Sequence, residues 1–432
     1  MIIRNADIFG KVSDILISGE LIIQIAAAGA LSGRLAGEHE MDAGGRTVLP
    51  GLIDPHVHLR CPGMEMKEDW ATGARAALAG GVTTVIDMPN TKPATETASA
   101  LDLKRAAASK TDAAGYPLGR LFWVGCSPDT LGELPGLLGE MDVAGVKLFF
   151  SESSGNNSSS DRAFVKAVFG AAADAGKPAA VHTELAELLE LSAGVGLPEL
   201  AMHGLRRPQS AAEAGTALVL ELAAETGCIA YLCHMSTAAE FEMVRSHKAR
   251  YGAESVIAEL SPHHLLLNEN HQVIGGPQSW AKVNPPLRTA GDNCAALRAL
   301  LDGTVDLIGS DHAPHLLSEK DGRNAGGFHG CPSGFPGLET ELGAVAGFLK
   351  EQSAEWRDLV SMLTNHNPAR IFGLEDRCGI AEGKRADLVI LDGPKIVDSG
   401  NFKTKAAYSP FNGMELQVSV YKTILRGKII EQ

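Results

Sequence analysis

The segment PGLIDPHVHLR, residues 50–60, places two histidines and an arginine in one short stretch of chain. His56 and His58 are two residues apart, so on an extended backbone both imidazoles leave the same face. Neutral imidazoles are common ligands of divalent metal ions, and Arg60 adds a planar cationic group beside them. A lone His-x-His pair also occurs on ordinary exposed strands. Further ligands downstream therefore decide whether this segment belongs to a metal site.

Four more residues of the ligand type follow apolar segments further along the chain: Lys147, His182, His234 and Asp311. Each has an ordinary explanation when it is taken singly. His182 or His234 could be a hydrogen-bonded core histidine, and Asp311 could cap a helix. Lys147, in the apolar segment GVKLFF, would be a costly buried cation unless it is paired or modified. Together, the four residues favour a metal site.

Eight short apolar segments, separated by alanine-rich stretches, would position these residues. The predicted strands cover residues 48–59, 83–89, 120–126, 145–150, 178–184, 229–235, 255–263 and 305–313. Residues 70–79, 161–175 and 211–226 are typical of the intervening helices. Alternating strands and helices indicate a parallel sheet, and eight such units predict an α/β fold of the closed (β/α)8 TIM-like type. Active sites of such barrels lie at the carboxyl ends of the strands, where the candidate ligands fall.

The two ends of the chain differ from this pattern. Residues 1–47 contain short strand-like pieces separated by glycine, and strand-like segments return from about residue 379. Neither piece could bury a core by itself. We therefore expect residues 1–47 and 375–432 to form one small β-sandwich domain that flanks a barrel of residues 48–374. The polar segment 151–160, after the fourth strand, is either a surface loop or a lid.

Composition excludes several classes of function. A formal charge of −14 argues against nucleic acid or an anionic membrane as a partner, and local cations would have to attract an anionic substrate. The seven cysteines include no Cys-x-x-Cys pair, which suits a reducing cytoplasm better than a disulfide framework. The sequence has neither the layout of a signal peptide nor an apolar stretch of membrane-spanning length. It predicts a soluble cytoplasmic protein.

The charge of Lys147 needs an explanation if the residue lies beside metal ions. An ammonium there would repel two divalent cations. Reaction of the amine with carbon dioxide gives a carbamate, whose two oxygens can bridge both ions. With Asp311 and four neutral imidazoles, the pair of ions stays positive enough to hold a hydroxide at a pH of roughly 7. Such a hydroxide attacks amides.

The chain resembles the dihydroorotases of the amidohydrolase superfamily along nearly its whole length. The motifs that carry the resemblance are DPHVHLR, GGVTTVIDMPNTKPAT, GVKLFF, VHTE, CHMSTAAE, SPHHL, KVNPPLR, GSDHAPH and SGFPGLET. Two further motifs, NHNPARIFGL and EGKRADLVILD, are shared more broadly among cyclic-amide hydrolases that combine the barrel with a flanking β domain. The pair MPNT and DHAPH narrows the resemblance to dihydroorotases.

The resemblance implies two zinc ions in each subunit, bridged by Lys147 as N6-carboxylysine. The implied ligands are His56, His58 and Asp311 for one ion and His182 and His234 for the other. The implied reaction is the reversible cyclisation of N-carbamoyl-L-aspartate to L-dihydroorotate by a metal-bridging hydroxide, a step of de novo pyrimidine biosynthesis. Asp311 would also be the acid and base of this reaction.

The resemblance also implies how the substrate is held. Arg60, Asn90 and His315 would meet its carboxylate, and Asn284 would lie near the ring. Independently of the resemblance, the planar donor fork of Arg60 suits bidentate binding of a carboxylate. The alternative for Arg60 is a structural salt bridge, for example to Glu68.

The ring substrate stays open at this point. Lys147 is shared with relatives that cleave hydantoins and dihydropyrimidines, so it supports the superfamily more than the substrate. The alternatives are a dihydropyrimidinase, hydantoinase or allantoinase, or a non-catalytic dihydroorotase-like subunit that supports aspartate transcarbamoylase. Inactive relatives of that kind usually lose metal ligands, and none is missing here. We also expect a homodimer, with aspartate transcarbamoylase as a further expected partner.

Overall fold

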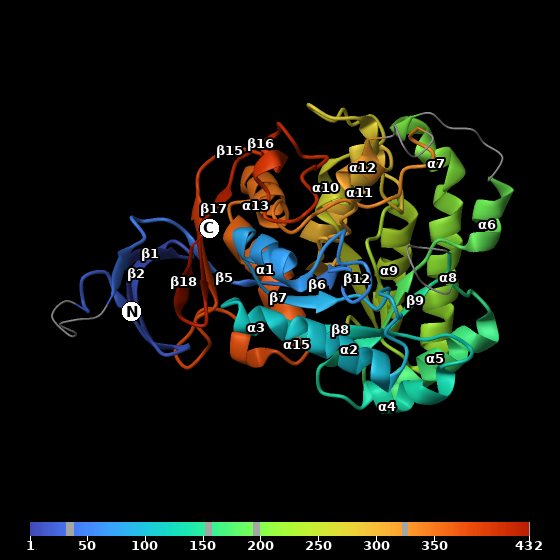
Figure 1. Cartoon of the computed structure of the whole chain (residues 1–432), viewed down its shortest axis with the longest axis horizontal. Helices are drawn as coiled ribbons and strands as arrows, with labels where there is room; N and C mark the ends of the chain where they lie inside the picture. Colours follow the sequence, from blue (N-terminus) through green and yellow to red (C-terminus); the bar gives the residue numbers. More distant parts are fainter. Residues whose placement is uncertain (32–38, 152–157, 193–198, 322–326, 432) are drawn as a thin grey trace.

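A barrel of eight parallel strands forms the centre of the computed structural model, which describes residues 1–31, 39–151, 158–192, 199–321 and 327–431 (Figure 1). The strands are β6 (Leu52–Val57), β7 (Val82–Asp87), β8 (Gly119–Gly125), β9 (Val143–Phe149), β10 (Ala179–His182), β11 (Ala230–Leu232), β12 (Val256–Leu260) and β13 (Leu307–Ile308). They are neighbours in their order along the chain. A parallel bridge between Val57 and His312 brings the chain after β13 back against β6. The predicted barrel is confirmed.

Helices surround this sheet, as the predicted alternation requires. The longer ones are α1 (Trp70–Ala79), α2 (Ala98–Ala108), α5 (Arg162–Asp174), α8 (Gln209–Thr226), α9 (Ala238–Tyr251), α11 (Ala290–Leu301) and α13 (Glu341–Gln352). The predicted helices 70–79, 161–175 and 211–226 correspond to α1, α5 and α8. Reciprocal capping boxes at Asp69, Thr237 and Thr289 fix where α1, α9 and α11 begin. With helices outside and side chains inside, the strands are buried on both faces, which explains their continuous apolar runs.

Short helical segments connect these elements. They are α3 (Lys110–Ala113), α4 (Leu134–Leu138), α6 (Ala186–Leu191), α7 (His203–Arg206), α10 (Pro262–Leu266), α12 (Leu317–Lys320), α14 (Trp356–Ser361) and α15 (Asn367–Ile371). Single tight or wide turns are η1 (Leu131–Glu133), η2 (Leu200–Met202), η3 (Gln278–Ala281), η4 (Met362–His366), η5 (Glu375–Arg377) and η6 (Ser399–Asn401). None of the helices in the described ranges is both long and apolar enough to cross a membrane.

Two small sheets from the chain ends pack together beside the barrel, with both termini on that side (Figure 1). One contains β1 (Ile2–Ile8), β2 (Lys11–Ser18), β3 (Leu21–Ala27) and β4 (Glu40–Asp42). The other contains β5 (Val48–Pro50), β14 (Leu388–Asp392), β17 (Ser419–Leu425) and β18 (Lys428–Ile430), and a separate pair joins β15 (Lys395–Ile396) to β16 (Glu415–Leu416). Ile3, Ile17, Val48, Leu388 and Ile424 belong to one apolar cluster that both sheets share. The predicted flanking β domain is therefore present.

The segment predicted as one strand over 48–59 is two strands with different partners. β5 pairs antiparallel with β14 in the flanking sheet, whereas β6 begins the barrel. Gly51 separates them, and a Cβ there would lie 2.4 Å from the Thr83 side chain. The run of apolar residues hides this change of sheet, because both strands are buried. Of the segment 151–160, predicted as a loop or lid, residues 152–157 lie outside the described residues.

Candidate metal centre

The six candidate ligands converge at the carboxyl ends of five barrel strands. They are His56 and His58 from β6 and the residue after it, Lys147 in β9, His182 at the end of β10, His234 after β11 and Asp311 after β13. Each is at most 7% exposed. All except Lys147 line a cavity of about 270 Å³. The barrel thus brings together residues that lie far apart in the sequence.

His56, His58 and Asp311 form one half of this centre. The Asp311 Oδ1 atom lies 3.4 Å from His56 Nε2 and 3.2 Å from His58 Nε2. A tetrahedral zinc ion with ligand bonds of about 2.0–2.1 Å separates its ligands by roughly 3.4 Å. The Asp311 oxygen is therefore spaced from each imidazole nitrogen as two ligands of one ion would be, and the three donor atoms all lie within 4.8 Å of one another.

His182, His234 and Lys147 form the second half. His182 Nδ1 and His234 Nε2 lie 3.1 Å apart, and the His234 ring centroid is 5.3 Å from that of His56. Burial lowers the pKa of His182 and moves the pKa of His234 well below its ordinary value, with the neighbouring rings adding to the effect at His234. Both imidazoles are therefore neutral, which is the ligating form.

Lys147 is a buried amine without a carboxylate. Its side chain is 1% exposed, and Nζ lies 2.7 Å from Cys233 Sγ and 4.9 Å from the centre of the Phe149 ring. No carboxylate of the described ranges lies within 4.0 Å of this amine, although an unpaired buried ammonium is unfavourable. Conversion to a carbamate would remove the cation and supply two oxygen ligands. The donor set of this half fits a metal ion once Lys147 is carboxylated.

Outer hydrogen bonds orient three of the four imidazoles. The pairs are His56 Nδ1 with Glu259 at 2.8 Å, His58 Nδ1 with Asn90 Oδ1 at 2.7 Å and His182 Nε2 with Glu184 at 2.9 Å. In the neutral tautomer whose N–H donates to the partner oxygen, the other ring nitrogen presents its lone pair to the cavity. Sequence reasoning did not find these roles of Glu259 and Glu184. A signal existed at Glu259, because it is a lone carboxylate inside the apolar strand β12.

Backbone strain and charge mark the same place. Three of the six described non-glycine residues with positive φ lie here, namely Arg60, His234 and Asp311 at 60°, 35° and 47°, a conformation that non-glycine residues adopt uncommonly. Burial raises the pKa of Asp311, but His56 and His58 outweigh burial and hold it well below its ordinary value. Burial lowers the pKa of His58 to about 3, with Arg60 adding to the effect. Asp311 is thus a carboxylate and His58 a neutral ligand.

Arg60 lines the metal cavity and is 2% exposed. Its Nε donates to the Pro314 carbonyl at 3.2 Å, and its Nη2 lies 3.3 Å from His315 Nε2. Within the part of the chain that the structure describes, no carboxylate lies within 4.0 Å of this guanidinium, so the alternative of a salt bridge to Glu68 is absent. The cavity therefore presents a buried cation that lacks an anionic partner.

The other predicted substrate contacts divide into two groups. Asn90 and Asn284 line the cavity. His315 does not line it: its ring is fully buried and lies 3.3 Å from Arg60 Nη2 and 3.0 Å from Lys67 Nζ. In the structure His315 contacts Arg60, and its contact with the substrate carboxylate stays a prediction.

Comparison with known proteins agrees with this geometry. The sequence matches the amidohydrolase family over residues 47–430. The chain belongs to the amidohydrolase family. This amidohydrolase is 36% identical to a dihydroorotase of Pelotomaculum thermopropionicum, over 95% of the chain and 92% of that protein. It is 34% identical to a dihydroorotase of Lactobacillus johnsonii, over 97% of the chain and 95% of that protein.

Solved structures of similar proteins have the same fold. The amidohydrolase chain superposes on an L-hydantoinase (dihydropyrimidinase) from Arthrobacter aurescens with a TM-score of 0.89 and 25% identity, over 100% of this chain and 96% of the other. A D-hydantoinase (dihydropyrimidinase) from Thermus sp. gives a TM-score of 0.86 at 25% identity, over 99% and 94% of the two chains. The barrel and its flanking domain thus match as one unit.

Proposed function

We propose that this amidohydrolase is a dihydroorotase, which interconverts N-carbamoyl-L-aspartate and L-dihydroorotate. The observation that carries the proposal is Arg60, a buried guanidinium in the metal cavity without a carboxylate partner in the described ranges. Dihydroorotate has a ring carboxylate that would pair with it, whereas hydantoin and dihydrouracil have none. The dihydroorotases at 34–36% identity support the same substrate.

The residues present fit two divalent cations, and we propose zinc. His56, His58 and Asp311 would hold one ion, and His182 and His234 the other, with carboxylated Lys147 between them. The spacing of the ring nitrogens and the orphaned amine of Lys147 support this assignment. When bound, such a pair supplies a hydroxide near neutral pH and polarises the amide carbonyl.

Asp311 would move the proton in the reaction. In ring opening, its ionised carboxylate accepts the proton of the attacking water and delivers it to the ring nitrogen as the C–N bond breaks. In ring closure, the same carboxylate takes the proton from the carbamoyl nitrogen. Arg60 binds the substrate carboxylate with its N–H groups, Asn90 contacts the same carboxylate, and Asn284 orients the ring from the cavity wall.

The variant Arg60→Met tests the substrate assignment. Losing a charge-assisted bidentate contact costs on the order of 2–4 kcal/mol, so kcat/KM for dihydroorotate should fall roughly 30- to 900-fold while the metal content stays unchanged. Wild-type protein is assayed beside the variant with dihydroorotate, hydantoin and dihydrouracil. Preference of the wild type for an uncharged ring, or an unchanged kcat/KM of the variant, overturns the proposal.

A hydantoinase or dihydropyrimidinase is the second candidate, because the solved structures that superpose on the chain bear those names. It would leave Arg60 without an anionic partner. The non-catalytic alternative is disfavoured by the complete ligand set. Metal analysis of freshly purified protein distinguishes it, because that alternative predicts protein without bound metal.

We propose that the enzyme works in the cytoplasm on a small-molecule substrate. All seven cysteines are free thiols, as expected in a reducing compartment. A homodimer and an association with aspartate transcarbamoylase stay predictions. Light scattering of the protein, alone and mixed with that enzyme, measures both.

A further inference from the structure

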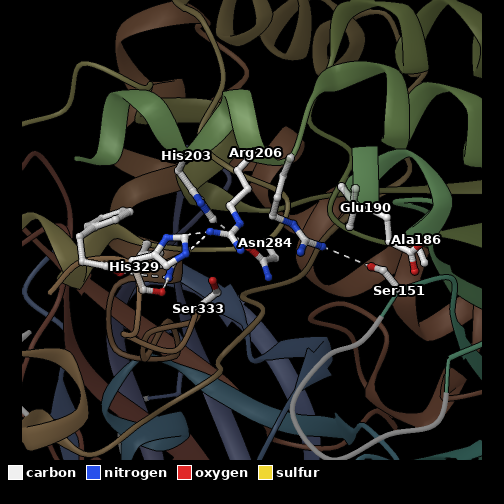
Figure 2. A pocket seen from close by; sticks show the side chains of 12 residues that line it. Ser151, Ala186, Glu190, His203, Arg206, Asn284, His329 and Ser333 are labelled. Carbon is white, nitrogen blue, oxygen red and sulfur yellow. Dashed lines mark hydrogen bonds between the residues drawn. The ribbon is translucent and has the colours of Figure 1, made fainter. Parts of the chain in front are cut away.

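A second cavity of about 380 Å³ adjoins the metal cavity (Figure 2). Asn284 and Ser333 line both, so the two spaces meet at these residues. The second cavity lies among α6, α7 and the segments around residues 282–284 and 328–333. It contains none of the proposed metal ligands. Its role must therefore come from its own side chains.

The walls of this cavity are cationic. Arg206, Arg207 and Lys282 line it, against the single carboxylate of Glu190 among its lining residues. Lys282 donates to three backbone carbonyls, and burial lowers its pKa to about 8, so it is still mostly charged at neutral pH. Arg207 is neutralised by Glu184, 2.7 Å away. A local positive charge thus faces a space in a chain whose formal charge is −14.

Arg206 is the cation with room for a ligand. Its guanidinium contacts the His329 ring, and no carboxylate of the described residues lies within 4.0 Å of it. Figure 2 shows the guanidinium of Arg206 between the side chains of His203 and His329. A neutral imidazole leaves the charge uncompensated, because burial and Arg206 itself lower the pKa of His329. Most N–H groups of Arg206 therefore stay available to an anion.

We propose that this cationic cavity is an anion-receiving vestibule, in which Arg206 binds a carboxylate of N-carbamoyl-L-aspartate before the substrate enters the metal cavity. The inference rests on the proposed function. N-Carbamoyl-L-aspartate carries two carboxylates, and the net charge of the chain opposes its approach. Cations that line a cleft reverse this repulsion locally and raise the rate of productive encounter. Arg206 acts on capture and not on the chemical step.

The experiment measures kcat/KM of the zinc-loaded enzyme for N-carbamoyl-L-aspartate as a function of ionic strength. Arg206→Gln should lower kcat/KM about tenfold at low ionic strength, with kcat and metal content unchanged. Glu190→Gln removes the opposing carboxylate and should raise kcat/KM about twofold. Both effects should vanish towards 1 M salt, where the screening length falls to about 3 Å.

Arg250→Gln is the matched control, because Arg250 is exposed on α9, lines neither cavity and carries the same charge. It should leave kcat/KM within twofold of wild type at every ionic strength. The vestibule proposal is overturned if the loss of kcat/KM in Arg206→Gln does not depend on salt. It is also overturned if Arg206→Gln and Arg250→Gln change kcat/KM equally. Wild-type protein that does not act on N-carbamoyl-L-aspartate or dihydroorotate overturns the proposed function instead. The two failures are thus distinguishable.

Discussion

The two halves of the candidate metal centre differ in what the polypeptide supplies. The half formed by His56, His58 and Asp311 contains its own anion, and its donor atoms are already spaced as ligands of one ion. The half formed by His182, His234 and Lys147 has two neutral imidazoles and an amine that contacts Cys233. The unmodified polypeptide thus supplies the anionic ligand of the first half. The second half gains an anionic ligand only when carbon dioxide converts Lys147 to a carbamate.

The residues that hydrogen-bond to the ligand histidines also differ in whether they contact one half of the centre or both. Glu259 reaches both halves, because it accepts from His56 Nδ1 at 2.8 Å and from the backbone N–H of His234 at 2.8 Å. A change at Glu259 would therefore disturb the whole centre. Among the ligand imidazoles, Glu184 hydrogen-bonds to that of His182 and Asn90 to that of His58. A substitution at either residue should thus disturb one half of the centre. Variants at these residues therefore test the two halves separately.

Lys147→Ala should abolish activity and remove metal from the second half, since the bridging group is lost. Activity should return in part with added acetate or propionate, which would restore a carboxylate in the space that alanine leaves. Metal content by mass spectrometry and kcat with and without the additive measure this. Lys166→Ala, at an exposed lysine paired with Glu225, is the control. Two tightly bound metal ions in Lys147→Ala would contradict the bridge.

The comparison also shows which parts of the centre the sequence predicts. His56 and Asp311 were found because strand ends in a parallel barrel share one face, a rule that does not depend on atomic detail. The contact of His315 with Arg60 was not predicted, because it depends on how one loop packs. The contact of Lys147 with Cys233 joins β9 to the residue after β11, with β10 between these two strands, and no spacing in the sequence reports it. The division between β5 and β6 was hidden because both strands are buried.

Asp311→Asn should lower kcat by about 10²–10⁴-fold, because the amide cannot take the proton of the attacking water. The second half should keep its metal, since its three ligands are unchanged. Steady-state kinetics and metal stoichiometry measure the two effects. Asp302→Asn, at an exposed aspartate that pairs with Arg245, is the control. A kcat within tenfold of wild type would show that another group moves the proton.

Glu184→Gln should weaken metal binding in the second half about 10- to 100-fold, the usual effect of removing a partner that orients a metal-binding histidine. The glutamine side chain keeps the shape but loses the charge that holds the Nε2–H of His182 and pairs with Arg207. Metal dissociation followed with a chelator should show one phase faster than in the wild type and one phase at the wild-type rate. Two equally slow phases would mean that Glu184 does not orient His182.

Asn90→Ala should have the smallest effect and should act on the first half. It removes one neutral hydrogen bond, from His58 Nδ1 at 2.7 Å, which contributes about 0.5–1.5 kcal/mol, or roughly 2- to 13-fold in the affinity of one ion. The same chelator experiment should show the fast phase in the opposite half from Glu184→Gln. Because Asn90 also lines the cavity, KM for dihydroorotate should rise as well. If both variants loosened the same ion, the division of the centre into two halves would be wrong.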